Sequence, residues 1–228
     1  MADQRLNDLL KWGIENSETA REASDNPPRP GDPRQGINAE ALAALLGGPT
    51  DADHMLNAMN AVTSPDVDVD SKLAAFDNFN MLIEDLNNAN NIENLSLQAE
   101  NKEKLGLWVP LLEQLKHNDA EMRRMAAWCI GTAVQNNEKT QKKLHELNGI
   151  PHLVTLSTTD PNSKVRERAI KSLSSAIRNY PPALDTTMEH LPAEWKTTGA
   201  VDANDMETVD NLIDSMKERS RKLDETQS

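Results

Sequence analysis

MRRMAAWCIGTAVQNN, residues 122–137, is the stretch that decides how this chain folds. Its apolar residues recur at steps of three and four, which places them on one side of a helix. These residues are Met122, Met125, Ala126, Cys129, Ile130, Ala133 and Val134. The stretch then ends in amides. It therefore predicts an amphipathic helix that buries one stripe and stops at an amide-rich turn.

A similar helix returns downstream as residues 165–179, VRERAIKSLSSAIRN. Ala126 and Ala169 lie 43 positions apart, and five more pairs share that offset: Arg123/Arg166, Ile130/Leu173, Ala133/Ala176, Val134/Ile177 and Asn136/Asn179. A degenerate earlier copy places Ala75, Phe79 and Ile83 at a longer spacing, 51 positions before Ala126, Ile130 and Val134. A helix that recurs near this period is typical of armadillo and HEAT solenoids. With no convincing strand-like alternation, we predict an all-α fold, a short armadillo-repeat α-solenoid.

The chain divides into three predicted parts. Residues 1–50 are expected to form a flexible N-terminal arm with two short amphipathic helices, separated by a proline- and glycine-rich linker over 17–36. Residues 51–200 are expected to form the armadillo-like repeats. Residues 201–228 are expected to form a capping helix near 205–223 and a tail, with Val209, Leu212, Ile213 and Met216 inward and a charged outer face.

Within 51–200 the pattern predicts further helix boundaries. Asp70 or Ser71 is expected to cap a helix whose apolar stripe runs from Leu73 to Leu86, with the amides 87–91 at its end. Later helices are expected over 108–115 and through 144–147, where Gly149 stops the second. The next copy opens at Ile150, and the period fades after Pro182.

The charge and the single cysteine limit the classes of function that the chain can have. The net charge of −13 argues against broad binding to nucleic acid or anionic membranes. The basic run Lys164, Arg166, Arg168 and Lys171 is interpreted as solvated helix faces. Cys129 lies on the apolar stripe and is expected to be a buried core residue. With no secretory, lipidation or membrane-spanning signal, we expect a cytoplasmic protein.

No motif indicates catalysis. The chain lacks a P-loop, a GxGxxG turn and a GxSxG elbow, and its five histidines are scattered without the spacing of a zinc site. We therefore expect a non-enzymatic protein with no metal and no cofactor.

The amide-rich helix ends are the candidate binding residues. Stacked repeats bring the last helices of successive units onto one surface, so polar groups in matching places would line a shared groove. The simpler interpretation is that each asparagine only terminates its helix by satisfying free carbonyls. Their recurrence at three helix ends favours the groove.

Several stretches resemble a known family. LNDLLKWGIENS (6–17), LLGGP (45–49), AFDNFNMLIEDLNNANNIENL (75–95), LWVPLLEQL (107–115) and RMAAWCIGTAVQNN (124–137) are similar to the armadillo-type nucleotide exchange factors of the 70-kDa heat-shock chaperone. The resemblance is to the fungal cytosolic Fes-one proteins, relatives of the animal heat-shock-protein-binding protein. It implies a curved clamp whose concave face grips one lobe of the chaperone's nucleotide-binding domain, so that ADP leaves.

The resemblance and the repeat together assign the clamp residues. They are Glu84, Asn87, Asn88, Ala89, Asn90, Asn91, Thr132, Gln135, Asn136, Asn137, Arg178 and Asn179. Ala89, a small residue among amides, suggests close approach by the partner, and Ala89→Arg is expected to fold yet lose exchange activity. In the N-terminal arm, Leu6, Leu9, Leu10 and Trp12 are expected either to be incidental or to occupy the chaperone's peptide-binding site.

Two departures from the family affect these expectations. Residues 96–106 look inserted, which leaves the repeat register near Trp108 open, and the chain lacks the additional C-terminal repeats of some relatives. The alternative function is an armadillo scaffold or cargo adaptor that binds an extended peptide in its groove. In either case a monomer is expected, because a solenoid capped at both ends has no free stacking face.

Overall fold

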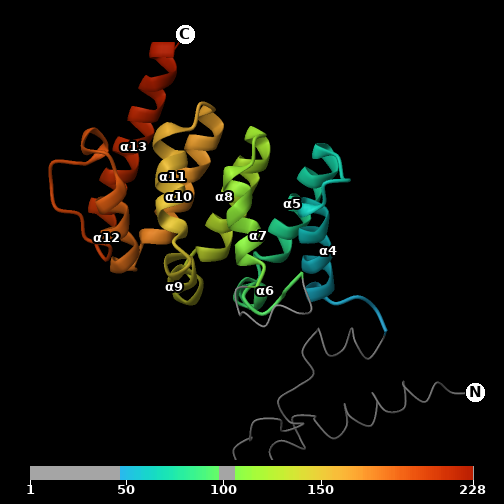
Figure 1. Cartoon of the computed structure of the whole chain (residues 1–228). Helices are drawn as coiled ribbons and strands as arrows, with labels where there is room; N and C mark the ends of the chain where they lie inside the picture. The colour runs from blue at the N-terminus through green and yellow to red at the C-terminus, as the bar shows by residue number, and fades with distance from the viewer. Residues whose placement is uncertain (1–46, 98–105, 228) are drawn as a thin grey trace, which may run out of the picture. The chain divides into compact units, whose positions relative to one another are not determined.

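The computed structural model describes residues 47–97 and 106–227, and every regular element in these two ranges is a helix (Figure 1). The backbone divides into two compact units, Met1–Asp51 and Ala52–Ser228. The first lies almost wholly outside the described residues, as do the arm residues Leu6, Leu9, Leu10 and Trp12 and the helices predicted there. The helices of the described part are α4 Asp51–Thr63, α5 Val69–Leu82, α6 Leu86–Asn91, α7 Trp108–Glu113, η2 Gln114–Lys116, α8 Ala120–Val134, α9 Glu138–Glu146, α10 Gly149–Thr159, α11 Ser163–Ile177, α12 Pro181–His190, η3 Ala193–Trp195 and α13 Met206–Gln227.

The 43-residue offset found in the sequence is a three-dimensional repeat. Helices α8 and α11 begin and end 43 positions apart, and so do their capping residues Asp119 and Asn162, whose side chains accept backbone N–H groups. The offset extends to α9 and α12, which begin at Glu138 and Pro181. α8 packs directly against both α5 and α11, and the three stand side by side (Figure 1). The predicted all-α fold of stacked helices is confirmed for the described residues.

The first copy departs from the predicted boundaries. α5 ends at Leu82 instead of continuing to Leu86, and the side chain of Asp85 caps a separate helix, α6, by accepting from the N–H groups of Asn87 and Asn88. A carboxylate that offers this local bond competes with continuation of the preceding helix. Leu86, predicted on the apolar stripe, is therefore 56% exposed.

The cap of α5 also lies earlier than predicted. Asp68, and neither Asp70 nor Ser71, is the capping residue, since its carboxylate accepts from the N–H of Ser71 at 2.9 Å.

Near the apparent insertion the repeat persists, with an offset of 41 positions in place of 43. The N–H of Leu107 donates to the carbonyl of Ile92 at 2.8 Å, which joins the chain on both sides of residues 98–105. Gly106 makes this closure possible: its φ is +56°, and a Cβ there would lie 2.1 Å from the Ile92 carbonyl oxygen. Beyond it, Trp108 is buried and begins α7, 41 positions before the equivalent start of α10 at Gly149.

A second glycine sets the spacing of α8 and α11. A Cβ on Gly131 would lie 2.6 Å from the Ser172 hydroxyl oxygen and 3.1 Å from the Ser172 Cα. That hydroxyl donates to the carbonyl of Ala127 at 2.5 Å. The backbones of the two helices therefore approach closely, which fixes how their outer faces lie next to each other.

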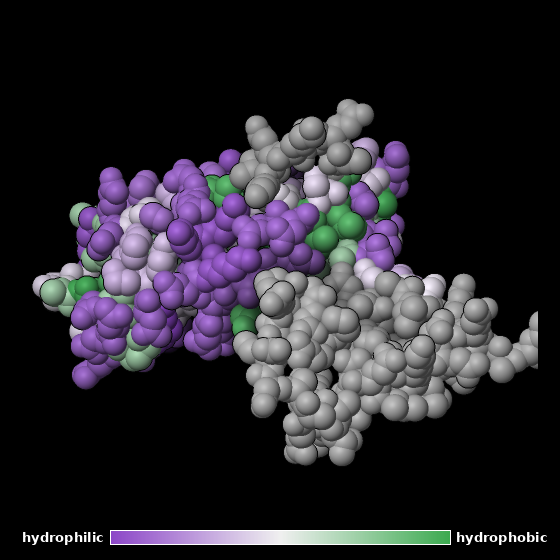
Figure 2. All heavy atoms as spheres, turned by 90° about the horizontal axis from the view of Figure 1, so that it is seen from below, coloured by the Kyte–Doolittle hydropathy of each residue, from purple (hydrophilic) through white to green (hydrophobic). Residues whose placement is uncertain are grey.

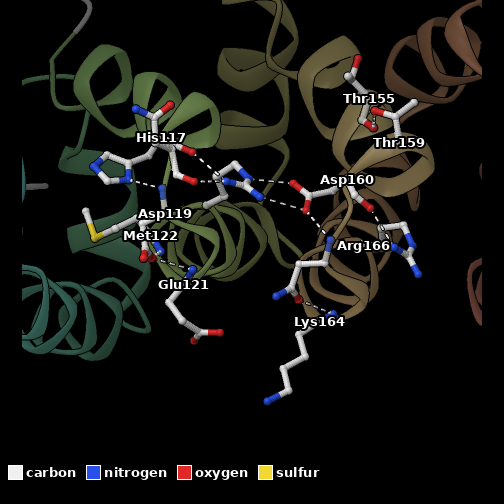
Figure 3. Close-up of polar contacts among 12 residues, drawn as sticks. His117, Asp119, Glu121, Met122, Thr155, Thr159, Asp160, Lys164 and Arg166 are labelled. Atoms are coloured by element: carbon white, nitrogen blue, oxygen red, sulfur yellow. Dashed lines mark hydrogen bonds and ion pairs between the residues drawn. The ribbon is translucent and has the colours of Figure 1, made fainter. Parts of the chain in front are cut away.

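Two arginines at matching repeat positions link each unit to the next. Arg123 donates to the carbonyls of His117 and Asn118 at 2.8 Å, and its Nε and Nη2 donate to the two carboxylate oxygens of Asp160 at 2.7 and 3.0 Å (Figure 3). Asp160 precedes α11, so Arg123 on α8 reaches forward to the turn of the following unit. Its fork-shaped contact is the geometry in which arginine binds carboxylates most strongly.

Arg166, 43 residues later, repeats this arrangement against the last helix. It donates to the carbonyl of Asp160 at 2.7 Å, to the hydroxyl and carbonyl of Ser220 at 2.9 and 3.1 Å, and to the carboxylate of Asp224. The side chain is only 1% exposed. Helix α13 thus occupies the place of a further unit, and its predicted inward residues Val209, Leu212, Ile213 and Met216 are buried.

Candidate functional site

The first group of predicted amides lies on α6, and it is only partly exposed. Asn88 donates its side-chain N–H to the carbonyl of Leu82 at 3.0 Å, which closes the end of α5. Asn91 accepts from Asn94 at 3.1 Å, and the side-chain oxygen of Asn90 is buried without a hydrogen-bond partner. Ala89 is 3% exposed and belongs to the core. Its burial contradicts the expectation that Ala89→Arg would fold normally, because an arginine at a core position would have to bury its charge or displace its neighbours.

The second and third groups form the turns that follow α8 and α11. Asn136 and Asn179, at matching positions, have φ of +52° and +57°, a conformation that asparagine tolerates better than other residues with a Cβ. Asn137 is buried, 6% exposed. These asparagines therefore act as helix terminators, as the simpler interpretation expected. Asn136 and Asn179 nevertheless remain exposed to solvent.

Contacts along one edge bring the three groups together. Lys139 at the start of α9 pairs with Glu93 at 2.8 Å and donates to the carbonyl of Asn90 at 3.4 Å, which joins α9 to α6. Gln141 donates to the carbonyls of Ser175 and Arg178 at 2.9 Å, which joins α9 to the end of α11. Figure 2 views the molecule from this lower side of Figure 1, and the surface there is mostly hydrophilic. Among the predicted clamp residues, the exposed ones are Glu84, Asn87, Gln135, Asn136 and Asn179.

Thr132 and Arg178 connect this edge to the neighbouring helices. Thr132 on α8 donates its hydroxyl to the side-chain oxygen of Asn80 on α5 at 2.9 Å. Arg178 donates to the Ser174 hydroxyl at 3.1 Å and pairs with Asp210 on α13. Both side chains are partly exposed while they bridge helices, so they hold the polar surface in place as well as forming part of it.

Sequence reasoning missed the outer face of α8 and α11 above these turns. Arg168 on α11 lies over the ring of Trp128 on α8, with 4.4 Å between the guanidinium carbon and the ring centroid. Beside them is a groove of about 340 Å³, which we call the α8–α11 groove; its lining residues are Glu121, Arg124, Lys164, Glu167, Arg168 and Lys171. The spacing of the sequence did indicate a second helix face, because Arg124, Trp128 and Thr132 recur every four residues beside the buried stripe. Nothing in the sequence showed which α11 residues would face them.

Three observations bear on the chemistry that the described residues offer. Burial raises the pKa of the Cys129 thiol far above its usual range, so it is no nucleophile. No group of three metal-ligating side chains occurs within 47–97 and 106–227. In the same part of the chain, no helix is long and apolar enough to cross a membrane.

Comparison with known proteins shows the family to which the chain belongs. The model of the nucleotide exchange factor Fes1 matches residues 6–92, and the model of the SIL1/FES1/HPBP1 C-terminal domain matches residues 98–191. The chain is 50% identical over 223 residues to the Hsp70 nucleotide exchange factor FES1 of Gibberella zeae, with 96% of this chain and 98% of that protein covered. It is 43% identical over 226 residues to the protein of that name from Coccidioides immitis.

The homologous protein of Saccharomyces cerevisiae is longer. It is 42% identical to this chain over 178 residues, which cover 75% of this chain and 55% of the yeast protein. With half of its residues identical to a relative of the same length, the chain belongs to the Fes1 family of nucleotide exchange factors.

Proposed function

We propose that this protein is a nucleotide exchange factor that binds the nucleotide-binding domain of a 70-kDa heat-shock chaperone and accelerates release of ADP. The observation that carries this proposal is the 50% identity, over nearly the full length of both chains, to a protein named as an Hsp70 nucleotide exchange factor.

The binding surface we propose is the polar edge formed by α6 and the ends of α8 and α11, together with the outer face of α8. Exposed Gln135, Asn136 and Asn179 are direct contacts in this proposal, and Thr132 and Arg178 fix the surface by their bonds to α5 and α13. Buried Ala89 and Asn137 support the backbone beneath it.

Thermodynamic linkage explains how such binding releases ADP. A protein that binds the open, nucleotide-free chaperone more tightly than the ADP-bound form must weaken ADP binding by the same factor. A rigid surface is suited to this, because a stiff binder gains its full contact energy only with the form of the chaperone that fits it. The joined units of α8, α9 and α11 provide that stiffness through partly buried hydrogen bonds such as those from Gln141 to the carbonyls of Ser175 and Arg178.

The remaining features of the proposal follow the sequence. The protein is a monomeric, non-enzymatic co-chaperone of the cytosol, with repeats over 51–200, a cap over 201–228 and an arm over 1–50. The unpaired, buried Cys129 is compatible with a reducing compartment. In the arm, Leu6, Leu9, Leu10 and Trp12 are proposed to compete for the chaperone's peptide-binding site.

A chaperone preloaded with a fluorescent ADP analogue tests the exchange activity. Substoichiometric amounts of the protein should accelerate loss of the fluorescent nucleotide when unlabelled ATP is in excess. We expect Gln135→Arg, at the exposed end of α8, to reduce this acceleration about tenfold, the equivalent of 1.4 kcal/mol of lost binding. Asn211→Arg, on an exposed position of α13, is the matched control and should be fully active.

The alternative, a scaffold or cargo adaptor that binds an extended peptide, predicts another result. Nucleotide loss would then be unchanged by any amount of the protein, and a peptide would bind without chaperone. That outcome would overturn the exchange-factor proposal.

A further inference from the structure

We propose that the α8–α11 groove holds an acidic side chain of the chaperone, seated between Arg124 and Arg168 beside Trp128. The proposal rests on the exchange function above and names the chemistry of one contact within it. It gives a specific role to basic residues that the sequence alone presented as solvated helix faces.

The groove is locally cationic on a chain whose net charge is −13. Its lining has four basic and two acidic residues. The two acids are already engaged within their own helices, Glu121 with Arg124 at 2.7 Å and Glu167 with Lys171 at 2.6 Å. Arg168 has no ion pair with any residue of the described part of the chain. A positive charge is therefore left over where the two helices meet.

Arg168 is held ready for a ligand. Its guanidinium lies 4.4 Å above the Trp128 ring, and this stacking leaves the N–H groups at the rim of the plane available. Desolvation, and then repulsion from Arg124, lower the pKa of Arg168 from its ordinary value. An anion placed near both arginines would relieve that repulsion. Since the stacked side chain is already ordered, little rotamer entropy remains to be lost when a ligand binds.

The size and rim of the groove favour a carboxylate over a polyanion. A volume of about 340 Å³ accepts one or two side chains. Nucleic acids and anionic membranes require an extended series of cations, whereas here Glu121 and Glu167 interrupt the positive charge. A single carboxylate forms a paired hydrogen bond with one guanidinium. An aspartate or glutamate on the chaperone surface is the ligand that matches.

Charge reversal at Arg168 is the direct test. The affinity of the full-length protein for the isolated nucleotide-binding domain is measured by calorimetry, and nucleotide release is measured at limiting protein. We expect Arg168→Glu to weaken binding at least tenfold and to slow release in proportion. Arg168→Gln removes the charge without reversing it and should show a smaller loss of affinity. It provides the measurement if the glutamate variant does not fold.

Lys142→Glu is the matched control. It makes the same change of charge on α9, where the Lys142 side chain is 67% exposed and only 4.0 Å from Glu146. It should bind and release nucleotide as the wild type does. If it weakens binding as much as Arg168→Glu does, the effect is one of total charge and the groove proposal is overturned.

The two proposals fail in different ways. If the wild-type protein accelerates ADP release and Arg168→Glu is as active, the groove proposal is wrong and the exchange function stands. If the wild type has no effect on ADP, the exchange function itself is wrong, and the groove proposal falls with it. Replacing one acidic residue of the chaperone with lysine should restore binding to the Arg168→Glu variant. The residue whose replacement does so is the one that carries the carboxylate.

Discussion

The junction between the repeats and the junction with the last helix each use an arginine at the same repeat position, Arg123 and Arg166, but the two arginines pair with different acids. Arg123 binds the carboxylate of Asp160, whose side chain is 3% exposed, within a turn of the repeat. Arg166 binds Asp224 near the end of α13, where the acid is 43% exposed, and gains three further acceptors from Ser220 and Asp160. At the inner junction the acid is buried, and at the outer one the base is buried.

This difference shows how a repeat array can end. The inner junction depends mainly on one desolvated ion pair, beside which Arg123 also donates to the carbonyls of His117 and Asn118. The outer junction distributes the arginine over neutral acceptors, so that an acid open to solvent suffices. A helix that is not a repeat can therefore replace one if it presents a hydroxyl and a carbonyl at the correct place.

The largest effect should come from Arg166→Met, which replaces the side chain with an apolar one of similar size and removes all four hydrogen bonds of the guanidinium. It removes the buried donor from the Asp160 carbonyl and from the Ser220 hydroxyl, and we expect a loss of about 3 kcal/mol in the free energy of unfolding. Urea denaturation measures this. Hydrogen exchange should show earlier loss of protection in α13 than in α8. Equal loss in both helices would mean that the two junctions are not independent.

A smaller effect should come from Asp160→Asn at the inner junction. The substitution preserves shape but leaves Arg123, 13% exposed, without its charge partner, and about 2 kcal/mol should be lost. Asp224→Asn is the matched change at the outer junction. It should cost about 0.5 kcal/mol, because the Asp224 side chain is 43% exposed and solvent screens the pair. Similar losses for the two variants would contradict the comparison drawn above.

The smallest effect should be a pH dependence at a third ion pair of intermediate exposure. The hydrogen bond from Lys139, and then the charges of Lys139 and Lys143, lower the pKa of Glu93, whose side chain is 25% exposed. A lowered pKa in the folded state means that the pair stabilises the fold above pH 4.5 and ceases to do so as the pH falls through the folded pKa. Glu93→Gln should therefore cost about 0.5 kcal/mol at pH 7.

The pH series carries its own control. The difference between Glu93→Gln and wild type should shrink as the pH falls below 4.5, as measured by urea midpoints. A difference that stays constant would assign the effect to packing instead of charge.

The sequence predicted the parts of the fold that depend on periodic burial. The offset between α8 and α11 follows from side chains such as Ala126 and Ala169, because both must face the same kind of core. It did not predict α12, which also repeats α9 but has a different surface composition. It also missed the break at Asp85, where a local hydrogen bond overrides an apolar stripe that continues to Leu86.

The candidate site was only partly accessible from the sequence. The asparagines were found because they recur, but recurrence did not distinguish Asn136, exposed with a positive φ, from Asn137, which is buried. The contact of Arg168 with Trp128 could not be foreseen, since it depends on the distance between two helices that Gly131 and Ser172 set.

The closure at Gly106 makes the segment beside it a natural place for engineering. Because a backbone hydrogen bond between Ile92 and Leu107 already fixes both ends, the chain length between them has little influence on the packing of Trp108. A reporter peptide or a fluorophore attachment site could be placed there, so that arrival of the partner is followed without altering the helices that meet it.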